Sequence, residues 1–141
     1  MAERMGAVCV MVRDNDGAIL MQHRDNNPGI LYPDHWSLLS GAVESSETPE
    51  QAMARELLEE AGYIARAMTL LFTSPQTVGG TTIERHIFLV DYDSSQTIIC
   101  NEGREIRFVT PVEILRLKVF GDHIGFIQRA RSKLNHNRLS I

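Results

Sequence analysis

The sequence is short of cysteine and has no long apolar run. Its two cysteines, Cys9 and Cys100, show no spacing to other cysteines or histidines that would suit zinc. Both lie in apolar runs, so we expect reduced, buried thiols. No stretch reaches the ~20 apolar residues of a membrane span, and the N-terminal apolar run is too short for a signal peptide. We therefore expect a cytoplasmic protein with no membrane partner.

The chain also lacks an excess of positive charge and a glycine-rich phosphate loop of the P-loop type. Its net charge of −4 argues against a broad nucleic-acid-binding surface. We therefore expect no stable nucleic-acid complex. Nucleotide ligands stay compatible with this charge, because a bound divalent cation can reverse the local sign.

The charge is distributed unevenly along the chain. From Arg116 to the C-terminus, six basic residues and one acidic residue give +5, which leaves −9 on the remainder. A solvated basic helix face is the simpler interpretation. The alternative is a basic rim that attracts an anionic substrate.

No internal repeat, linker or low-complexity segment divides the sequence. Its 141 residues, 43% hydrophobic and 23% charged, are typical of one globular domain. We therefore predict a single domain spanning residues 1–141. Strand and helix patterns are mixed along this length, which indicates an α/β or α+β fold with a mixed sheet and helices on both sides.

Apolar and β-branched runs, separated by turn signals, place the expected elements. Strands are predicted at residues 7–12, 19–24, 36–39, 70–73, 83–92 and 106–110, and residues 97–100 suit a short strand or an extended loop. The first strand should be covered on both faces and form a hairpin with the second. Loops are predicted at residues 25–34 and 74–82, a chain break at 121–125, and further helices at 112–117 and 126–135.

The clearest helix signal covers residues 49–61. Thr48 is a suitable N-cap, Pro49 suits the first helical position, and Gln51 completes a capping box. Gly62 follows as a left-handed C-cap. These signals predict both ends of the helix.

This helix groups three carboxylates. With 100° of rotation per residue, Glu59 and Glu60 fall about 60° and 40° to either side of Glu56. Apolar residues fall about 100–200° from Glu56 and define the expected buried face (Ala54, Leu57, Leu58 and Ala61). The acids are therefore expected to point away from the core.

Three glutamates on one helix face are commonly just solvated, and this is the simplest interpretation of the spacing. However, clustered carboxylates repel one another, and two lie four residues apart, which costs a helix a few tenths of a kcal/mol. A hard divalent cation such as Mg²⁺ or Mn²⁺ would make the cluster favourable, since these ions take oxygen ligands. The preceding loop adds Glu44 and Glu47, and Gly41 permits close backbone approach.

The segment that contains these acids resembles the signature motif of a known family. Residues 41–63 match the Nudix box at eight positions in type and spacing (Gly41, Glu47, Arg55, Glu56, Leu57, Glu59, Glu60 and Gly62). Tyr63 departs from the usual aliphatic residue, and Leu39-Ser40 stands where the family often has Pro-Gly. The resemblance extends to the flanking strands and implies a Nudix-type α/β/α sandwich with a mixed β-sheet.

The resemblance also implies a reaction and roles for residues. Glu56, Glu59 and Glu60 would hold Mg²⁺ or Mn²⁺, and Arg55 would orient a carboxylate, Glu47 or Glu59. The metal-activated water would attack a phosphorus atom, and a carboxylate would take its proton. The implied substrate is a nucleoside diphosphate linked to another moiety, such as a nucleoside triphosphate, a nucleotide sugar or an ADP-ribose-like compound.

The general base has three candidates: Glu59, Glu105 just before the strand at 106–110, and Glu102. Arg24, Gly41 and Glu47 are expected to contact the substrate. Trp36, Phe72 and Tyr32 would suit stacking on a base, although large aromatic residues more often belong to the core.

Two other functions stay open on the sequence alone. A Nudix-fold module could sense a nucleotide without cleaving it, although such proteins usually have an eroded box. An acidic helix that binds Ca²⁺ or a partner is the second alternative. A homodimer is also expected to be possible, since many relatives pair.

Overall fold

The protein, seen here as a computed structural model that describes residues 6–139, contains seven strands and three helices in that range. Residues 1–5, where the segment assessed for a signal peptide begins, lie outside the described residues. The strands and helices follow in the order β1 (Ala7–Arg13), β2 (Ile19–His23), β3 (Trp36–Ser37), β4 (Leu39–Ala42), α1 (Pro49–Ala61), β5 (Thr69–Val78), β6 (Thr81–Asp91), β7 (Glu105–Val109), α2 (Pro111–Ile114) and α3 (His123–Leu139).

The strands form one mixed sheet around β1. Strand β1 pairs antiparallel with β2 and β4 and parallel with β6. Strand β5 completes one edge beside β6, while β3 and β7 both pair with β2. The predicted hairpin of the first two strands is confirmed, with Arg13 opposite Ile19.

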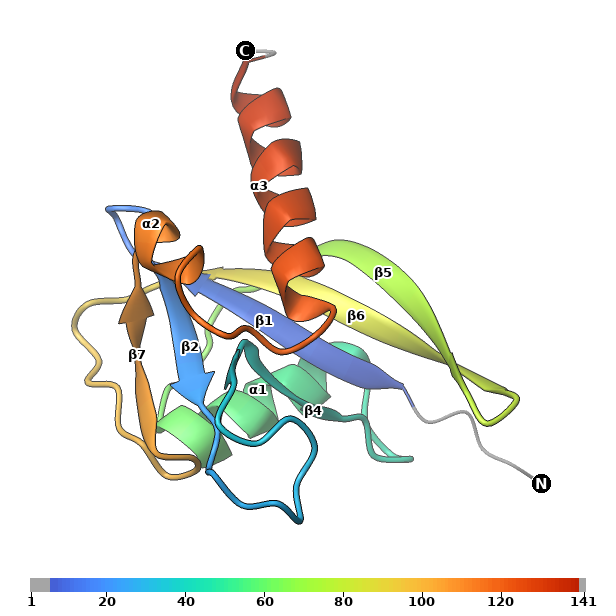
Figure 1. The fold of residues 1–141 in the computed structure, drawn as a ribbon. Coiled ribbons are helices and arrows are strands. Elements are labelled where there is room, and N and C mark those ends of the chain that lie inside the picture. Colours follow the sequence, from blue (N-terminus) through green and yellow to red (C-terminus); the bar gives the residue numbers. More distant parts are fainter. Residues whose placement is uncertain (1–5, 140–141) are drawn as a thin grey trace.

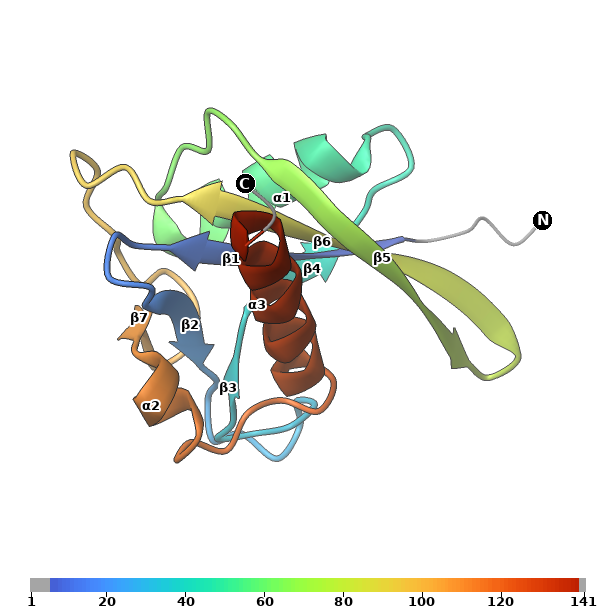
Figure 2. The ribbon, with the colours of Figure 1, turned by 90° about the horizontal axis from the view of Figure 1, so that it is seen from above.

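Helices α1 and α3 cover opposite faces of this sheet (Figures 1 and 2). Side chains alternate along β1, because successive residues of a strand point to opposite faces. Val8, Val10 and Val12 belong to the core beneath α1, whereas Cys9 and Met11 belong to the core beneath α3. The predicted α/β/α sandwich with a mixed sheet and the doubly covered first strand are both confirmed.

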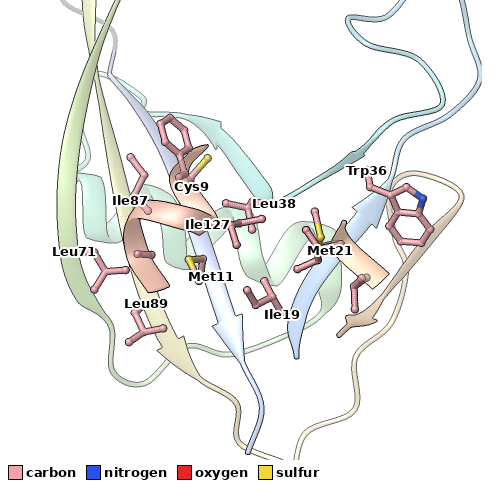
Figure 3. Close-up of a cluster of buried hydrophobic side chains, with 14 of the residues drawn as sticks. Cys9, Met11, Ile19, Met21, Trp36, Leu38, Leu71, Ile87, Leu89 and Ile127 are labelled. Carbon is pink, nitrogen blue, oxygen red and sulfur yellow. The ribbon is translucent and has the colours of Figure 1, made fainter. Parts of the chain in front are cut away.

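The α3-side core joins residues from distant parts of the chain (Figure 3). Met21 and Trp36 belong to the same buried cluster as side chains of β5, β6 and α3, including Leu71 and Ile127. Trp36 is only 7% exposed and Phe72 8%, so both aromatic residues are core residues rather than open stacking surfaces. Tyr32, the third aromatic candidate, is 41% exposed.

His123, the first residue of α3, fastens this helix to the sheet. Its Nδ1 accepts a hydrogen bond from the Leu38 backbone N–H at 3.1 Å, so in the neutral ring Nε2 carries the proton. Nε2 lies 3.4 Å from Cys9 Sγ, to which it can donate. Burial raises the pKa of Cys9 to about 12, which keeps it a thiol. Cys100, expected to be buried, is exposed.

The prediction of a loop at residues 74–82 is wrong. Strand β5 continues through Pro75 to Val78, and the reversal is confined to Gly79 and Gly80, both at positive φ. Pro75 is tolerated because β5 pairs with β6 alone among the described strands, so the missing N–H can face outward. The resulting β5–β6 ribbon projects beyond the body of the molecule (Figure 2).

Three other boundaries differ from the sequence prediction. The strand predicted at 36–39 divides at Leu38 into β3, which pairs with β2, and β4, which pairs with β1. Helix α2 is a single capped turn that ends at Ile114. Helix α3 begins at His123, so Gly125 lies inside the helix instead of breaking the chain. For residues 97–100, where a short strand and an extended loop are both predicted as possible, the structure has no strand, in agreement with the second alternative.

The basic C-terminal segment lies mostly on α3, on the face of the sheet opposite α1 (Figure 1). Arg129 packs its guanidinium 4.1 Å from the Phe72 ring centroid, and Lys133 Nζ donates to the Leu71 carbonyl. These contacts support the interpretation of a basic helix face rather than a rim beside the α1 carboxylates. No helix among the described residues has the length and apolar character needed to cross a membrane.

Candidate active site

The caps of α1 form as the sequence predicts. The Thr48 side chain accepts from Gln51 N at 3.2 Å, and the Gln51 side chain accepts from Thr48 N at 2.9 Å. Gly62 adopts φ 65° and its N–H bonds back to the last turn of the helix. Both helix ends are therefore determined by local interactions.

The buried face of α1 is rotated from its predicted position. Leu58, expected inside, is 52% exposed, whereas Glu60, expected to point away from the core, is 4% exposed. The residues that do pack inward are Ala52, Met53, Leu57 and Ala61. Met53 lies about 60° from Glu56 on the side of Glu60, so the buried sector includes the sector that holds the acids. The prediction went wrong because it left Ala52 and Met53 out of the apolar stripe.

Burial gives Glu60 an unusual carboxyl group. Its pKa is strongly raised, first by burial and then by a hydrogen bond with Glu56 and the negative charges of Glu56, Glu102 and Glu59. A buried carboxylate among acids is unfavourable unless a proton or a cation accompanies it. The cluster thus provides oxygen ligands, and a positive charge bound there would relieve the repulsion among its carboxylates.

Arg55 connects α1 to residues 42–48, the segment from the end of β4 to α1 that we call the box loop. Its Nε and Nη2 donate to both carboxylate oxygens of Glu47, at 3.1 and 2.6 Å, and Nη2 also donates to Ala42 O at 3.0 Å. Nη1 donates to Glu56 at 2.8 Å and lies 3.4 Å from Glu59. The bidentate contact lowers the pKa of Glu47. Glu47, expected to contact substrate, serves in this structure as the partner of Arg55.

Gly41 makes room for Glu56. A Cβ added at Gly41 would lie 2.2 Å from Glu56 Cδ, a distance that no real contact allows. The Glu56 carboxylate therefore packs directly against the backbone of β4. In this structure Gly41 lies against this carboxylate, and its expected contact with substrate stays a prediction.

Two candidate bases, Glu102 in the loop before β7 and Glu105 at the start of β7, are placed differently. Ile106 packs beneath α1, so strand alternation turns its neighbours Glu105 and Arg107 toward the other face. There Glu105 lies 3.6 Å from Arg107, which covers the Trp36 ring. Glu102, in contrast, is among the charges that act on Glu60. The structure therefore favours Glu102 over Glu105 as a companion of the α1 carboxylates.

Arg24 serves to hold the loop that follows β2. Its Nε donates to Leu31 O at 3.0 Å, and its guanidinium lies 5.3 Å from the Phe120 ring centroid. In that loop Tyr32 and Asp34 have positive φ values of 49° and 63°. Both of these contacts lie away from the α1 carboxylates, and the expected contact of Arg24 with substrate stays a prediction.

Tyr63, the departure from the usual box, is 2% exposed and ties the end of the box to β6. Its hydroxyl accepts from Asp93 N at 2.9 Å and donates to Asp91 O at 3.5 Å. The ring fills the α1-side core. This position therefore keeps its buried role with a larger side chain.

The side chains present fit a hard divalent cation. Glu56, Glu59, Glu60 and Glu102 supply oxygen atoms, and the repulsion around buried Glu60 would be relieved by positive charge. Within the part of the chain that the structure describes, no three acidic, His or Cys side chains already converge as a metal site. Arg55 holds one carboxylate oxygen of Glu56 and one of Glu59, so it does not engage the second oxygen of either group.

Known proteins share this sequence pattern and fold. The model of the NUDIX domain family matches residues 3–130. The NAD-capped RNA hydrolase NudC of Shigella dysenteriae is 32% identical over 92 residues, which are 65% of this chain and 33% of that protein. This chain thus spans about a third of the length of the curated relatives it matches.

Solved structures agree with this match. The Nudix hydrolase RenU of M. smegmatis has a TM-score of 0.75 and 28% identity, over 96% of this chain and 89% of that one. The NUDIX domain of Shewanella oneidensis NrtR, solved with ADP ribose, has a TM-score of 0.78 over 95% and 90% of the two chains. Its 17% identity supports the fold alone. Because the family model covers most of the sequence, the chain belongs to the Nudix hydrolase family, as the motif at residues 41–63 predicts.

Proposed function

We propose that this chain is a hydrolase that cleaves the diphosphate bond of a nucleoside diphosphate derivative with the help of Mg²⁺ or Mn²⁺. The observation that carries the proposal is buried Glu60, held next to Glu56 at the centre of an acidic cluster. A purely structural helix gains nothing from such a group, because burying a carboxyl among like charges costs free energy. A metal site explains why it is there.

In this proposal Glu56, Glu59 and Glu60 hold the metal ion. When bound, the ion neutralises phosphate charge and lowers the pKa of a water molecule that attacks phosphorus. Glu102 or Glu59, both exposed, accepts the proton of that water. Arg55 keeps the Glu56 and Glu59 oxygens oriented through charge-assisted hydrogen bonds.

The substrate class follows from the chemistry of the site and from the relatives. NudC is named for hydrolysis of NAD-capped RNA, and the NrtR domain was solved with ADP ribose. Both ligands contain a nucleoside diphosphate joined to a second moiety. We extend this class to the present chain, with nucleoside triphosphates, nucleotide sugars and ADP-ribose-like compounds as its candidate members.

A substrate panel tests the proposal. The purified protein is incubated with each of these compounds, NAD and NAD-capped RNA, with Mg²⁺ and separately with Mn²⁺, and released product is measured. We expect metal-dependent turnover of at least one diphosphate, and removal of most activity by Glu59→Gln. Glu50→Gln is the matched control, because Glu50 is an exposed glutamate in the first turn of the same helix.

Two results would contradict hydrolysis. Nucleotide binding without turnover, unchanged in Glu59→Gln, would instead support a sensing module. Calorimetry that detected neither metal nor nucleotide would leave an acidic helix with another role. Light scattering on the same sample measures whether the chain forms the homodimer that the family resemblance makes possible.

A further inference from the structure

We infer that Gln22, on β2 and outside the Nudix box, is a positioning residue that holds the loop of Glu102 against the carboxylates of α1. The Glu102 loop comprises residues 101–104, between β6 and β7. This inference rests on the proposed function, since it assigns Glu102 a part in the same reaction. It adds a residue that the box motif does not contain.

Gln22 is a buried polar side chain in the middle of the sheet. It is 6% exposed and shares a strand face with Leu20, which packs in the core beneath α1. Its Nε2 donates to the carbonyl oxygen of Glu102 at 2.9 Å. A buried amide costs free energy unless it is hydrogen-bonded, so this contact fixes both the side chain and the loop.

The backbone of the loop is also fixed at both ends. Asn101 N donates to Glu60 O at 2.9 Å, which joins the loop to the last turn of α1. Arg104 N donates to His23 O at 2.8 Å, which joins it to β2. Gln22 acts between these two anchors, at Glu102 itself.

Gly103 allows this close approach. It has φ 84°, and an added Cβ would lie 2.8 Å from His23 O and 2.9 Å from Gln22 Cγ. A side chain at this position would therefore move the loop away from β2. The sequence thus combines a glycine in the loop with a hydrogen-bond donor beneath it.

The reason for such anchoring is electrostatic. Glu102 is exposed, and its negative charge is one of those that raise the pKa of buried Glu60 on α1. Without a restraint, the loop would relax away from the cluster in the absence of a cation. Holding the backbone through Gln22 keeps the Glu102 carboxylate within reach of the site before metal and substrate arrive.

The test replaces Gln22 by methionine, which has a similar length and no donor. We expect Gln22→Met to lower kcat about 10–100-fold, with a smaller change in KM, and to weaken Mn²⁺ binding in calorimetry. The Gln22→Met change is then repeated in a Glu102→Gln background. There it should change kcat less than about twofold, because residues that act through one another are not additive.

Hydrogen exchange supplies a readout without turnover. In Gln22→Met the amides of Asn101 and Arg104 should exchange at least about tenfold faster, while the amides of β1 keep their protection. Gly103→Ala perturbs the same loop from its other side and should reproduce the losses, which keeps the inference testable if Gln22→Met does not fold. Gln96→Met is the matched control, because the Gln96 amide also donates to a backbone carbonyl, that of Ile64, at 2.9 Å.

The outcomes separate the inference from the proposed function. If the wild-type protein shows no metal-dependent turnover, the proposed function fails first. If it is active, then normal kcat in Glu102→Gln, or equal losses from Gln22→Met in both backgrounds, overturns the positioning role while hydrolysis stands. An effect of Gln96→Met as large as that of Gln22→Met would likewise show general loop destabilisation.

Discussion

Glu60 combines two properties that surface helices avoid. It is 4% exposed, and the groups that act on its charge are other glutamates. Its raised pKa means that the folded protein binds a proton here more tightly than the unfolded chain does. The stability that this bound proton contributes is therefore fully present below about pH 4.5, the ordinary pKa of a glutamate. It is lost as the pH rises through the higher pKa of the folded state.

Glu60→Gln tests the free-energy cost of burying this carboxyl group among other acids. In the presence of EDTA at pH 7, we expect the variant to be more stable than wild type by about 1–3 kcal/mol, because wild type must take up a proton at Glu60 when it folds, whereas the amide is neutral in both states. Its activity with Mg²⁺ should fall about 100-fold or more. Urea unfolding and product release measure the two effects, and a variant that was less stable without metal would contradict this account.

His123 makes stability depend on pH in the acid range. Burial, reinforced by Arg85 and Arg24, lowers its pKa from 6.5 to about 4. Between these values the unfolded chain binds a proton that the folded protein does not, so stability falls as the pH drops from about 6.5 to about 4. We expect this residue to account for about 2–3 kcal/mol of the loss.

Urea unfolding of wild type and His123→Gln across this pH range checks the effect. Glutamine cannot titrate, so the difference in free energy of unfolding between the two proteins should shrink as the pH falls. A constant difference from pH 7 to pH 4 would show that His123 does not titrate on unfolding.

At the scale of elements, α1 is fixed to its surroundings by its caps and by Arg55. The caps are local, since Thr48 and Gln51 satisfy each other's backbone N–H groups. The contacts of Arg55 reach further along the chain, because it donates to Ala42 and Glu47 in the box loop. The caps thus stabilise the helix ends, whereas Arg55 links Glu56 and Glu59 to Glu47, and we propose that this link orients the carboxylates.

Thr48→Ala should separate these roles. We expect a loss of about 1 kcal/mol in the free energy of unfolding, because the Gln51 N–H loses its acceptor. The kcat should stay within about twofold of wild type, since the Thr48 N–H and side chain both bond Gln51 and not the metal-binding acids. Thermal unfolding and steady-state kinetics measure these two quantities.

Arg55→Lys should have the opposite profile. Lysine keeps the charge but cannot reach Glu47 bidentately while also donating to Glu56 and Ala42. We expect kcat to fall about 10–100-fold, as for other groups that orient ligands. Arg66→Lys, in the segment after α1, is the control, and a normal kcat in Arg55→Lys would argue against the orienting role.

At the scale of the whole molecule, the acidic cluster lies where α1, the box loop and the loop before β7 meet. A cation that binds the folded state but not the unfolded chain stabilises folding by mass action, by about 2.7 kcal/mol at 100 times its Kd. Saturating Mn²⁺ should therefore raise the Tm of wild type by several degrees. The shift should be much smaller in Glu60→Gln, and an equal shift in both proteins would place the ion elsewhere.

Much of the fold was predictable because its signals are local. The turn at residues 14–17, the apolar run of β1 and both caps of α1 depend on neighbours in the sequence. Strands are predicted at 70–73 and 83–92, but the continuation of β5 to Val78 is not, since Pro75 indicates a loop unless the strand is known to lie at a sheet edge. Gly125 was likewise taken as a breaker, although α3 continues through it.

The box, the family and the grouping of Glu56, Glu59 and Glu60 can all be predicted from the sequence, because spacing along one helix fixes which side chains are neighbours. Which of these acids is buried depends on where the sheet meets α1, so it becomes known only from the packed fold. The packed fold also turns Glu105 away from the cluster and brings Gln22 beneath Glu102. The contact between Gln22 and Glu102 joins residues 80 positions apart, and nothing in the local sequence encodes such a contact.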